Sequence, residues 1–256
     1  QSRFYQAFVT RFNTYHNGHE AYKEGLASQE QSHKDNYMEI IPLFPISKES
    51  TRSAGGGSFD KAIEKSQKAV KLHSIKTKPK KKAGRELTEE DKRWMAKKEY
   101  NPFLHNAWML MGKAQFQKGE FLEAASTFSY ITRLYSDEPA IVAEARMRMA
   151  QCYAELEWNY EAENLLTQIQ RDTIPYQLAE EYDAIMASHL LLQERFEEAL
   201  PYLEKAVKRS GRSKKQKTRE YYLLGQIHKH VGNKAQAYKA FGKAIKQNPP
   251  YELEFN

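Results

Sequence analysis

A set of small and apolar residues recurs along this chain at a spacing of 37 to 38 residues. Two copies of the pattern, at 107–136 and 221–249, are clear, and two copies between them are degenerate. One alanine marks each copy, at Ala124, Ala162, Ala199 and Ala237. A fixed period of this length is typical of stacked helical repeats, whereas a helical bundle has no reason to keep one. The period therefore constrains the fold more than any other feature of the chain.

Small residues also recur about twelve positions before each marker alanine, where two antiparallel helices would approach closely. They are Gly112, Ala150, Ala187 and Gly225. This pairing of small positions, with bulky residues one turn away, is the pattern of a tetratricopeptide repeat. One hairpin cannot bury its apolar stripe alone, so consecutive hairpins stack into a superhelix. We therefore predict an all-α fold, a tetratricopeptide-repeat superhelical solenoid of antiparallel helical hairpins, with four repeats over 102–256.

Residues 1–75 do not follow this period. An aromatic stripe from Phe4 to Tyr15, followed by the turn signal Asn17-Gly18, predicts a helical hairpin over 4–34. Residues 59–69 resemble the second helix of a repeat without an adjacent first helix, so we expect an interrupted N-terminal repeat. The intervening loop, 35–57, carries an apolar run at 40–46 and is too apolar for a simple linker. We expect this loop to lie on the helices or to contact a partner.

Residues 76–101 are predicted to form a basic linker and a short helix. Thr88 can cap that helix with Asp91 at its third position, as in a capping box. Asn101 followed by Pro102 then predicts the start of the next helix, because asparagine is a good N-cap and proline is tolerated at the first helical position. The regular repeats begin there.

The net charge of +7 comes from two runs rather than from the whole surface. Residues 76–85 hold six basic side chains, residues 208–219 hold seven, and neither run contains an acidic residue. Neither has the interleaved aromatic residues of a single-strand stacking platform, so we expect no nucleic-acid partner. A solvated loop and a docking patch for an acidic protein stay open for each run. The candidate patch residues are Lys80, Lys81, Lys82, Lys214, Lys215 and Lys217.

No catalytic, cofactor-binding or metal-binding motif stands out in the sequence. The eight histidines are scattered, and the glycines at 55–57 lack the Lys and Ser/Thr of a phosphate-binding loop. The single cysteine, Cys152, falls inside a predicted helix, where a buried small hydrophobe is the expected role. We therefore expect a protein that is not an enzyme and that needs no cofactor.

The repeat register also predicts a protein-binding groove. The concave face of such an array is lined by first-helix positions that do not pack on the second helix. Asn106 and Lys113 on this face resemble the carboxylate clamp of peptide-binding members, but Glu144 and Glu155 follow in place of further cations. We therefore expect general protein docking, with a peptide-binding co-chaperone-like tetratricopeptide module as the alternative. The predicted groove residues are Asn106, Met109, Lys113, Phe116, Gln117, Glu144, Met147, Gln151, Glu155, Arg219, Tyr222, Gln226 and Lys229.

Several long runs are more specific than the repeat pattern. They are RFNTYHNGHEAYKEG (11–25), DNYMEIIPLFPIS (35–47), FDKAIEKSQKAVKLHSIKTKPKKK (59–82), KKEYNPFLHNAWMLMGKAQFQKGEFLEAASTFSYITRLY (97–135) and NPPYELEFN (248–256). Together they closely resemble the PorW/SprE family of Bacteroidetes over essentially the full length, including the interrupted first repeat.

The resemblance implies a lipoprotein of the type IX secretion system on the periplasmic face of the outer membrane, which also supports motility in gliding species. It implies partners of two kinds, a periplasmic ring of the PorK/PorN type and an outer-membrane translocon of the Sov/SprA type. Cys152 lies inside a repeat and cannot be the lipidated cysteine of the family. We therefore expect the lipid anchor, and with it the only membrane contact, to lie upstream of Gln1.

Overall fold

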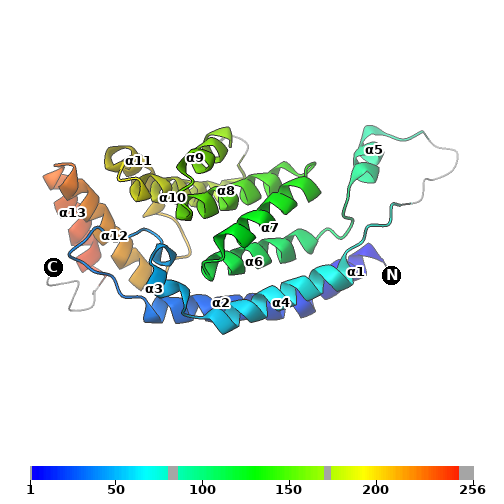
Figure 1. The fold of residues 1–256 in the computed structure, drawn as a ribbon. Coiled ribbons are helices and arrows are strands. Elements are labelled where there is room, and N and C mark those ends of the chain that lie inside the picture. The colour runs from blue at the N-terminus through cyan, green and yellow to red at the C-terminus, as the bar shows by residue number, and fades with distance from the viewer. Residues whose placement is uncertain (1, 80–85, 170–173, 248–256) are drawn as a thin grey trace.

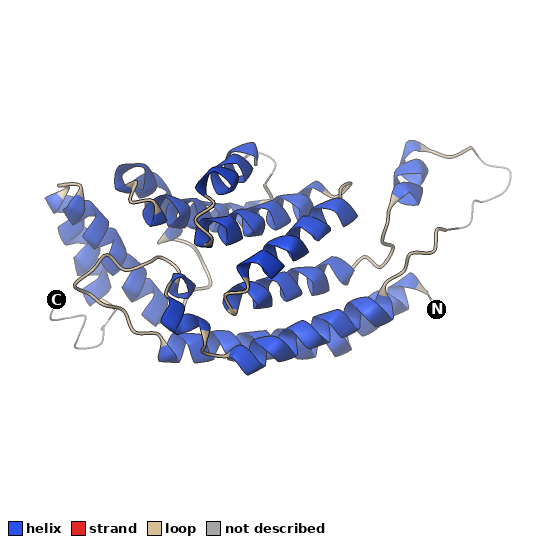
Figure 2. Ribbon diagram, viewed as in Figure 1, coloured by secondary structure: helices blue, strands red, loops and turns tan. Residues whose placement is uncertain are grey.

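The computed structural model describes residues 2–79, 86–169 and 174–247, and these form an array of helical hairpins without a β-strand (Figures 1 and 2). The first helix is long and continuous, running through α1 (Arg3–Val9), a π-helical stretch η1 (Thr10–Tyr15) and α2 (His16–Ser32). Helix α4 (Gly56–His73) packs against it, and α6 (Leu104–Gln117) packs against α4. The prediction of an all-α tetratricopeptide-repeat solenoid is confirmed.

The regular part of the array consists of four hairpins in chain order. In each, the second helix starts after a short turn and packs on the first. The pairs are α6 with α7 (Phe121–Leu134), α8 (Pro139–Glu155) with α9 (Asn159–Gln168), α10 (Tyr176–Leu192) with α11 (Phe196–Ala206), and α12 (Lys214–His230) with α13 (Lys234–Ile245).

The hairpin turns repeat one backbone conformation. The residue with positive φ falls at Gly119, Glu157, Glu194 and Gly232, which keeps the period of the sequence pattern. The two clear copies place glycine there, and the two degenerate copies place glutamate. A side chain disfavours this left-handed region, so the degenerate copies tolerate some backbone strain that the clear copies avoid.

Glycine makes the close helix contact that the register predicted. A Cβ atom built on Gly112 would lie 2.6 Å from the ring of Phe128, and one on Gly225 would lie 2.5 Å from the ring of Phe241. The four marker alanines are buried in the hairpin interiors. Both small positions are therefore needed for the ring to fit between the helices.

The N-terminal prediction was partly wrong. Asn17 and Gly18 do not form a turn but lie inside α2, so residues 4–34 are not a hairpin. Gly18 is buried because the neighbouring helices come close: a Cβ atom added to it would lie 3.1 Å from the Cβ of Lys65 and 3.3 Å from Leu110. The missing first helix of the interrupted repeat is α2 itself, which packs on α4.

The same glycine–phenylalanine contact closes this first hairpin. A Cβ atom on Gly25 of α2 would lie 2.5 Å from the ring of Phe59 on α4. The two residues are 34 positions apart, whereas Gly112 and Phe128 are 16 apart. The inserted segment lengthens the spacing of this pair, so the pattern of the regular repeats does not predict the contact.

The connection between α4 and α6 contains the short helix α5 (Glu89–Ala96). Its predicted cap is confirmed: the Thr88 hydroxyl accepts from the Asp91 backbone N–H, and the Asp91 carboxylate accepts from the Thr88 backbone N–H. Helix α6 starts at Leu104, two residues later than predicted, although the Asn101 side chain accepts from the Phe103 backbone N–H (3.0 Å). Within the described residues, no helix is both long and apolar enough to cross a bilayer.

Candidate protein-binding groove

The apolar loop of the interrupted repeat lies on the helices, on the concave side of the array. This was one of the two expectations for it, the other being contact with a partner. We call residues 35–47 the strap. Figure 1 shows the segment between α2 and α3 (Glu49–Arg52) running out to α12 and back. Its contacts with α12 and with the core fall into three groups, and its end is bonded to α8.

The first group is a buried ion pair. Arg219 of α12 donates from Nε to Asp35 Oδ2 (2.6 Å) and from a terminal nitrogen to Asp35 Oδ1 (3.0 Å). The same guanidinium also donates to the backbone oxygens of Pro42 and Leu43. His33 Nε2 lies 2.9 Å from Asp35 Oδ1, the oxygen that also accepts from the terminal nitrogen of Arg219. Burial alone would raise the pKa of Asp35, but the hydrogen bonds from His33 and Arg219 lower this pKa to about 2.

The second group consists of hydrogen bonds to the strap backbone. The Gln226 amide donates to the Glu39 carbonyl (2.6 Å) and accepts from the Ile41 N–H (3.1 Å), so one side chain satisfies two backbone groups. The Tyr222 hydroxyl donates to the Tyr37 carbonyl (3.1 Å). The array thus holds the strap through its main chain, and these bonds do not depend on the strap's own side chains.

The third group is apolar. Ile41 and Leu43 are buried in the core cluster formed by α10 to α13, and Ile46 is buried in the cluster formed by α6 to α8. Phe44 packs against both of these clusters and against the cluster between α8 and α11. The strap therefore contributes to the core of several repeats at once, and it is not an outer covering of a finished surface.

The strap ends on α8. The Ser47 hydroxyl donates to Glu155 Oε1 (2.6 Å), and Arg52 lies 3.9 Å from the same carboxylate. Burial raises the pKa of Glu155, and the Ser47 hydrogen bond and Arg52 offset this only in part. Glu155 was predicted as a groove residue, and here it serves the chain's own segment.

Three further predicted groove residues are also occupied by the strap, namely Arg219, Tyr222 and Gln226. Lys113 forms an ion pair with Glu144 (2.7 Å), one repeat further along. Burial alone would raise the pKa of Glu144, but the positive charges of Lys113 and Arg148 hold this pKa below its ordinary value. The carboxylate that a clamp lysine would capture from a partner is therefore supplied by the array itself.

The remaining predicted groove residues divide by whether they line the space that the strap leaves open. Met109 and Met147 are core residues, so their assignment to a partner-facing surface was wrong: neighbouring helices cover them. Asn106 is half-buried and bonds the Phe103 carbonyl, while Lys229 is exposed. Phe116, Gln117 and Gln151 line what is left of the groove.

What is left is a central cavity of about 350 Å³ between α2, the strap, α6, α8 and α12. The strap provides its apolar wall through Leu43 to Ile46. The lining also includes Arg148, which is paired with Glu181 of the next repeat, and Glu220, which is paired with Arg209 (2.8 Å) and Arg212. The Arg148–Glu181 pair thus links two repeats, whereas the Glu220 pairs tie α12 to the connection that precedes it.

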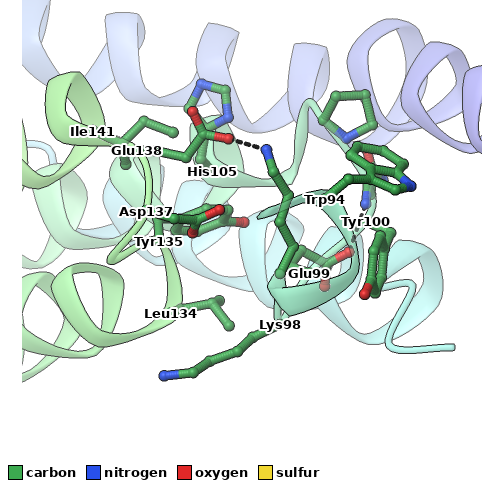
Figure 3. Close-up of a pocket in the computed structure, with 13 residues that line it drawn as sticks. Trp94, Lys98, Glu99, Tyr100, His105, Leu134, Tyr135, Asp137, Glu138 and Ile141 are labelled. Atoms are coloured by element: carbon green, nitrogen blue, oxygen red, sulfur yellow. Dashed lines mark hydrogen bonds and ion pairs between the residues drawn. The ribbon is translucent and has the colours of Figure 1, made fainter. Parts of the chain in front are cut away.

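A smaller pocket of about 140 Å³ lies where α5, α6 and α7 meet (Figure 3). In this close-up, Trp94 and Tyr100 lie on one side and Tyr135, Asp137 and Glu138 on the other. Lys97 and Glu138, which both line this pocket, form an ion pair. Among the described residues, no group of three or more His, Cys, Asp or Glu side chains is placed to hold a metal ion.

The second basic run, residues 208–219, has fewer side chains available to a partner than its sequence suggests. Its three arginines point inward, Arg209 and Arg212 to Glu220 and Arg219 to Asp35. Lys214 and Lys215 are exposed, Lys217 is half-buried, and Lys215 bonds the Glu30 backbone oxygen. Lys80, Lys81 and Lys82 lie outside the described residues. The prediction of a docking patch therefore rests on lysines alone.

Cys152 is fully buried in the core cluster of α6 to α8, which confirms its expected role. Burial raises the pKa of its thiol well above the ordinary value, so the thiol stays protonated and unreactive.

Comparison with known proteins supports the fold. A tetratricopeptide-repeat family model matches residues 221–251, and no curated protein matches the chain. The structure of BtubC (BKLC) from P. vanneervenii is 12% identical with a TM-score of 0.52, covering 97% of this chain and 91% of that one. A putative kinesin light chain of Podosopora anserina with nearly identical TPR-like repeats is 16% identical, covering 75% and 88% with a TM-score of 0.46.

These findings, taken with the geometry, give the class of the molecule. The last hairpin matches the repeat family by sequence, and the other hairpins share its packing. Tetratricopeptide arrays are typically non-catalytic scaffolds for protein interactions. The chain is thus an all-α tetratricopeptide-repeat solenoid of the protein-binding type, with its concave groove partly filled by its own strap.

Proposed function

We propose that this chain is a non-catalytic scaffold of the type IX secretion system. In this role it binds ring subunits of the PorK/PorN type and the Sov/SprA-type translocon on the periplasmic side of the outer membrane, and it is needed for secretion and gliding. The observation that carries the proposal is the resemblance of the long runs to the PorW/SprE family. Those runs include the strap and both helices of the interrupted hairpin, which are features outside the general repeat pattern.

The strap is consistent with a connector. A solenoid held only by neighbour contacts bends easily, because each repeat touches only the next. Here Asp35 and Arg219 join the end of the first helix to the last repeat, 184 positions away. Such a cross-brace suits a scaffold that links two large assemblies. Because the braced solenoid keeps its curvature, a displacement at one end is transmitted to the other.

The test is a pull-down from the periplasmic extract of a secreting or gliding Bacteroidetes species, with this chain as bait. Recovery of ring or translocon subunits supports the proposal. Recovery of neither by a bait that gives a cooperative thermal transition contradicts it. A destabilised control is provided by Arg219→Ala, which removes the brace, and a folded control by Gly242→Ala on α13, where an added Cβ meets no atom within 4 Å.

The basic linker has a separate test. If it steers docking to an acidic partner, Lys80→Ser/Lys81→Ser/Lys82→Ser slows association with the recovered subunit and weakens its salt dependence, while thermal stability is unchanged. An unaltered association rate would make the linker a solvated loop.

A further inference from the structure

The turns of the regular hairpins follow one another along an edge of the array, and the first three turns are strongly acidic. Residues 119–123, 156–163 and 192–198 hold eight glutamates and one cation, Arg195, in a chain whose net charge is +7. The fourth turn, 230–236, has no acidic residue. We call the first three turns the acidic edge. Its charge is opposite to that of the chain as a whole.

The repeat period places the carboxylates of the acidic edge in rows, because equivalent positions of stacked repeats line up along a solenoid. One row consists of Glu123, Glu161 and Glu198, and a second contains Glu157 and Glu194. Contacts between the hairpins keep the turns adjacent. Phe121 of the first turn and Leu156 of the second pack in one core cluster, and Arg195 of the third turn bonds Glu163 of α9 (2.9 Å). The acidic edge is therefore one surface across three hairpins.

Most of these carboxylates have no partner within the chain. Arg195 pairs with Glu163 and with Glu198 (2.7 Å), and Lys118 pairs with Glu120. The other five are exposed, and among the described residues they form no side-chain hydrogen bond or ion pair. They are Glu123, Glu157, Glu161, Glu194 and Glu197. An acid in the first turn of a helix stabilises that helix, but Glu157 and Glu194 lie before their helices, in the turns.

Apolar side chains are exposed among these carboxylates. Leu122 and Tyr160 occupy equivalent positions of two repeats and are 51% and 80% exposed, and Trp158 between them is 44% exposed. The third turn adds a shallow depression of about 440 Å³, which extends to the fourth turn where the rings of Phe196 and His230 touch (centroids 4.5 Å apart). Ring faces and carboxylates both attract cations, so this surface suits guanidinium or ammonium groups.

The charge of the edge narrows the kind of occupant. Nucleic acids and anionic lipid head groups carry phosphate, which these carboxylates repel. A second copy of the chain could not use the same edge, because glutamate would face glutamate. The copy would have to offer a different surface, and contacts of that kind build rings or filaments instead of a closed pair.

A basic segment of another protein fits the charge, the rings and the depression together. Arginine combines the required contacts, since its guanidinium pairs with carboxylates in bidentate geometry and stacks on aromatic faces. We propose that the acidic edge binds a partner protein through a segment rich in arginine, with apolar residues of that segment against Leu122 and Tyr160. The depression offers Glu194 and Glu197 to one of the arginines. This inference does not depend on the secretion role.

The test selects random peptides displayed on phage against the whole chain at about 150 mM salt, where distant charges are screened. Enriched peptides are expected to carry an excess of arginine over aspartate and glutamate, with apolar residues between the arginines. Their affinity should fall by about tenfold or more for Glu157→Gln/Glu161→Gln/Glu194→Gln/Glu197→Gln, because each substitution removes a carboxylate that pairs with the peptide. Binding to the unaltered chain should also weaken as salt rises.

Two controls separate local contact from net charge and from exposure. Glu24→Gln/Glu64→Gln/Glu86→Gln/Glu90→Gln changes the net charge equally at exposed positions away from the edge, and it should leave the affinity unchanged. Tyr160→Ala should weaken binding several-fold, whereas Tyr238→Ala, which removes a ring that is 83% exposed on α13, should not. Thermal denaturation checks that every variant stays folded.

Several results would overturn the proposal. They are enriched peptides without a basic excess, equal affinities for the edge variant and its charge-matched control, and a selection that yields no peptide sensitive to the edge variant. Sedimentation that shows self-association of the unaltered chain, lost in the edge variant, would assign the acidic edge to a second copy. The pull-down of secretion subunits is a separate experiment, so its failure and the failure of this proposal can be told apart.

Discussion

The first and second hairpins of this array make the same contact with very different connections. In α6 and α7 a short turn brings Gly112 to Phe128, while in α2 and α4 an insertion of some twenty residues separates Gly25 from Phe59, yet the Cβ-to-ring distances agree within 0.1 Å. The packing of a hairpin is therefore set by its small and large side chains and not by its connection. The insertion is free to serve another role, and here it occupies part of the concave groove.

Substitutions that release the strap should cause the largest loss of unfolding free energy. Arg219→Ala leaves the buried Asp35 carboxylate without its main partner, which is expected to cost roughly 3 to 5 kcal/mol of unfolding free energy. Lys229→Ala, ten residues further along α12 and exposed, should cost less than about 0.5 kcal/mol. Urea unfolding of both variants measures the difference, and equal midpoints would mean that the ion pair does not hold the strap.

The shared glycine contact predicts equal damage in the two hairpins. Gly25→Leu and Gly112→Leu are each expected to cost roughly 1 to 3 kcal/mol, because the added side chain must displace a phenylalanine ring in a packed core. Gly242→Ala is the control, since a Cβ there meets no atom within 4 Å and should stabilise α13 slightly. Urea unfolding measures both variants. A large loss of unfolding free energy in Gly112→Leu without a similar loss in Gly25→Leu would show that the two hairpins do not share the same packing.

Acid should weaken the attachment of the strap. The pKa of Asp35 falls from 3.8 to about 2 on folding. Its contribution, roughly 2 kcal/mol, is therefore fully present above the unfolded pKa and is lost as the pH falls through the folded value. Stability measured between pH 5 and pH 2 should decline less steeply in Asp35→Asn than in the unaltered chain. Parallel curves would show that Asp35 has no such role.

The smallest effect concerns the degenerate repeats. Glu157 and Glu194 adopt positive φ where the clear copies have glycine. Replacing either by glycine should raise the unfolding free energy by up to about 1 kcal/mol, because it relieves left-handed strain. Thermal denaturation of Glu194→Gly is the measurement, and a lowered transition temperature would contradict the strain.

Local chemistry made much of this fold predictable. The glycines at 112 and 225, the marker alanines and the Thr88 cap act through neighbours at fixed spacing, so their roles could be inferred from the sequence. The turn at Asn17 and Gly18 was misread because glycine there serves close packing with Lys65 and Leu110, and that cause lies in another helix.

The groove was less predictable for the same reason. Its register positions were correctly placed on the first helices, but Arg219, Tyr222 and Gln226 are bonded to a segment more than 180 residues earlier. No local pattern signals such a pairing. The apolar run at 40–46 was the only sign that the loop would be buried, and it could not say where.

The most direct test of the account compares two thiols within the strap. Leu43 is 2% exposed and faces the core, whereas Met38, five residues earlier, is 85% exposed. The account predicts that maleimide labels Met38→Cys about a hundredfold faster than Leu43→Cys under native conditions, with buried Cys152 unlabelled in both. Equal labelling of the two introduced thiols, with Cys152 still protected, would show an open groove and contradict the central claim.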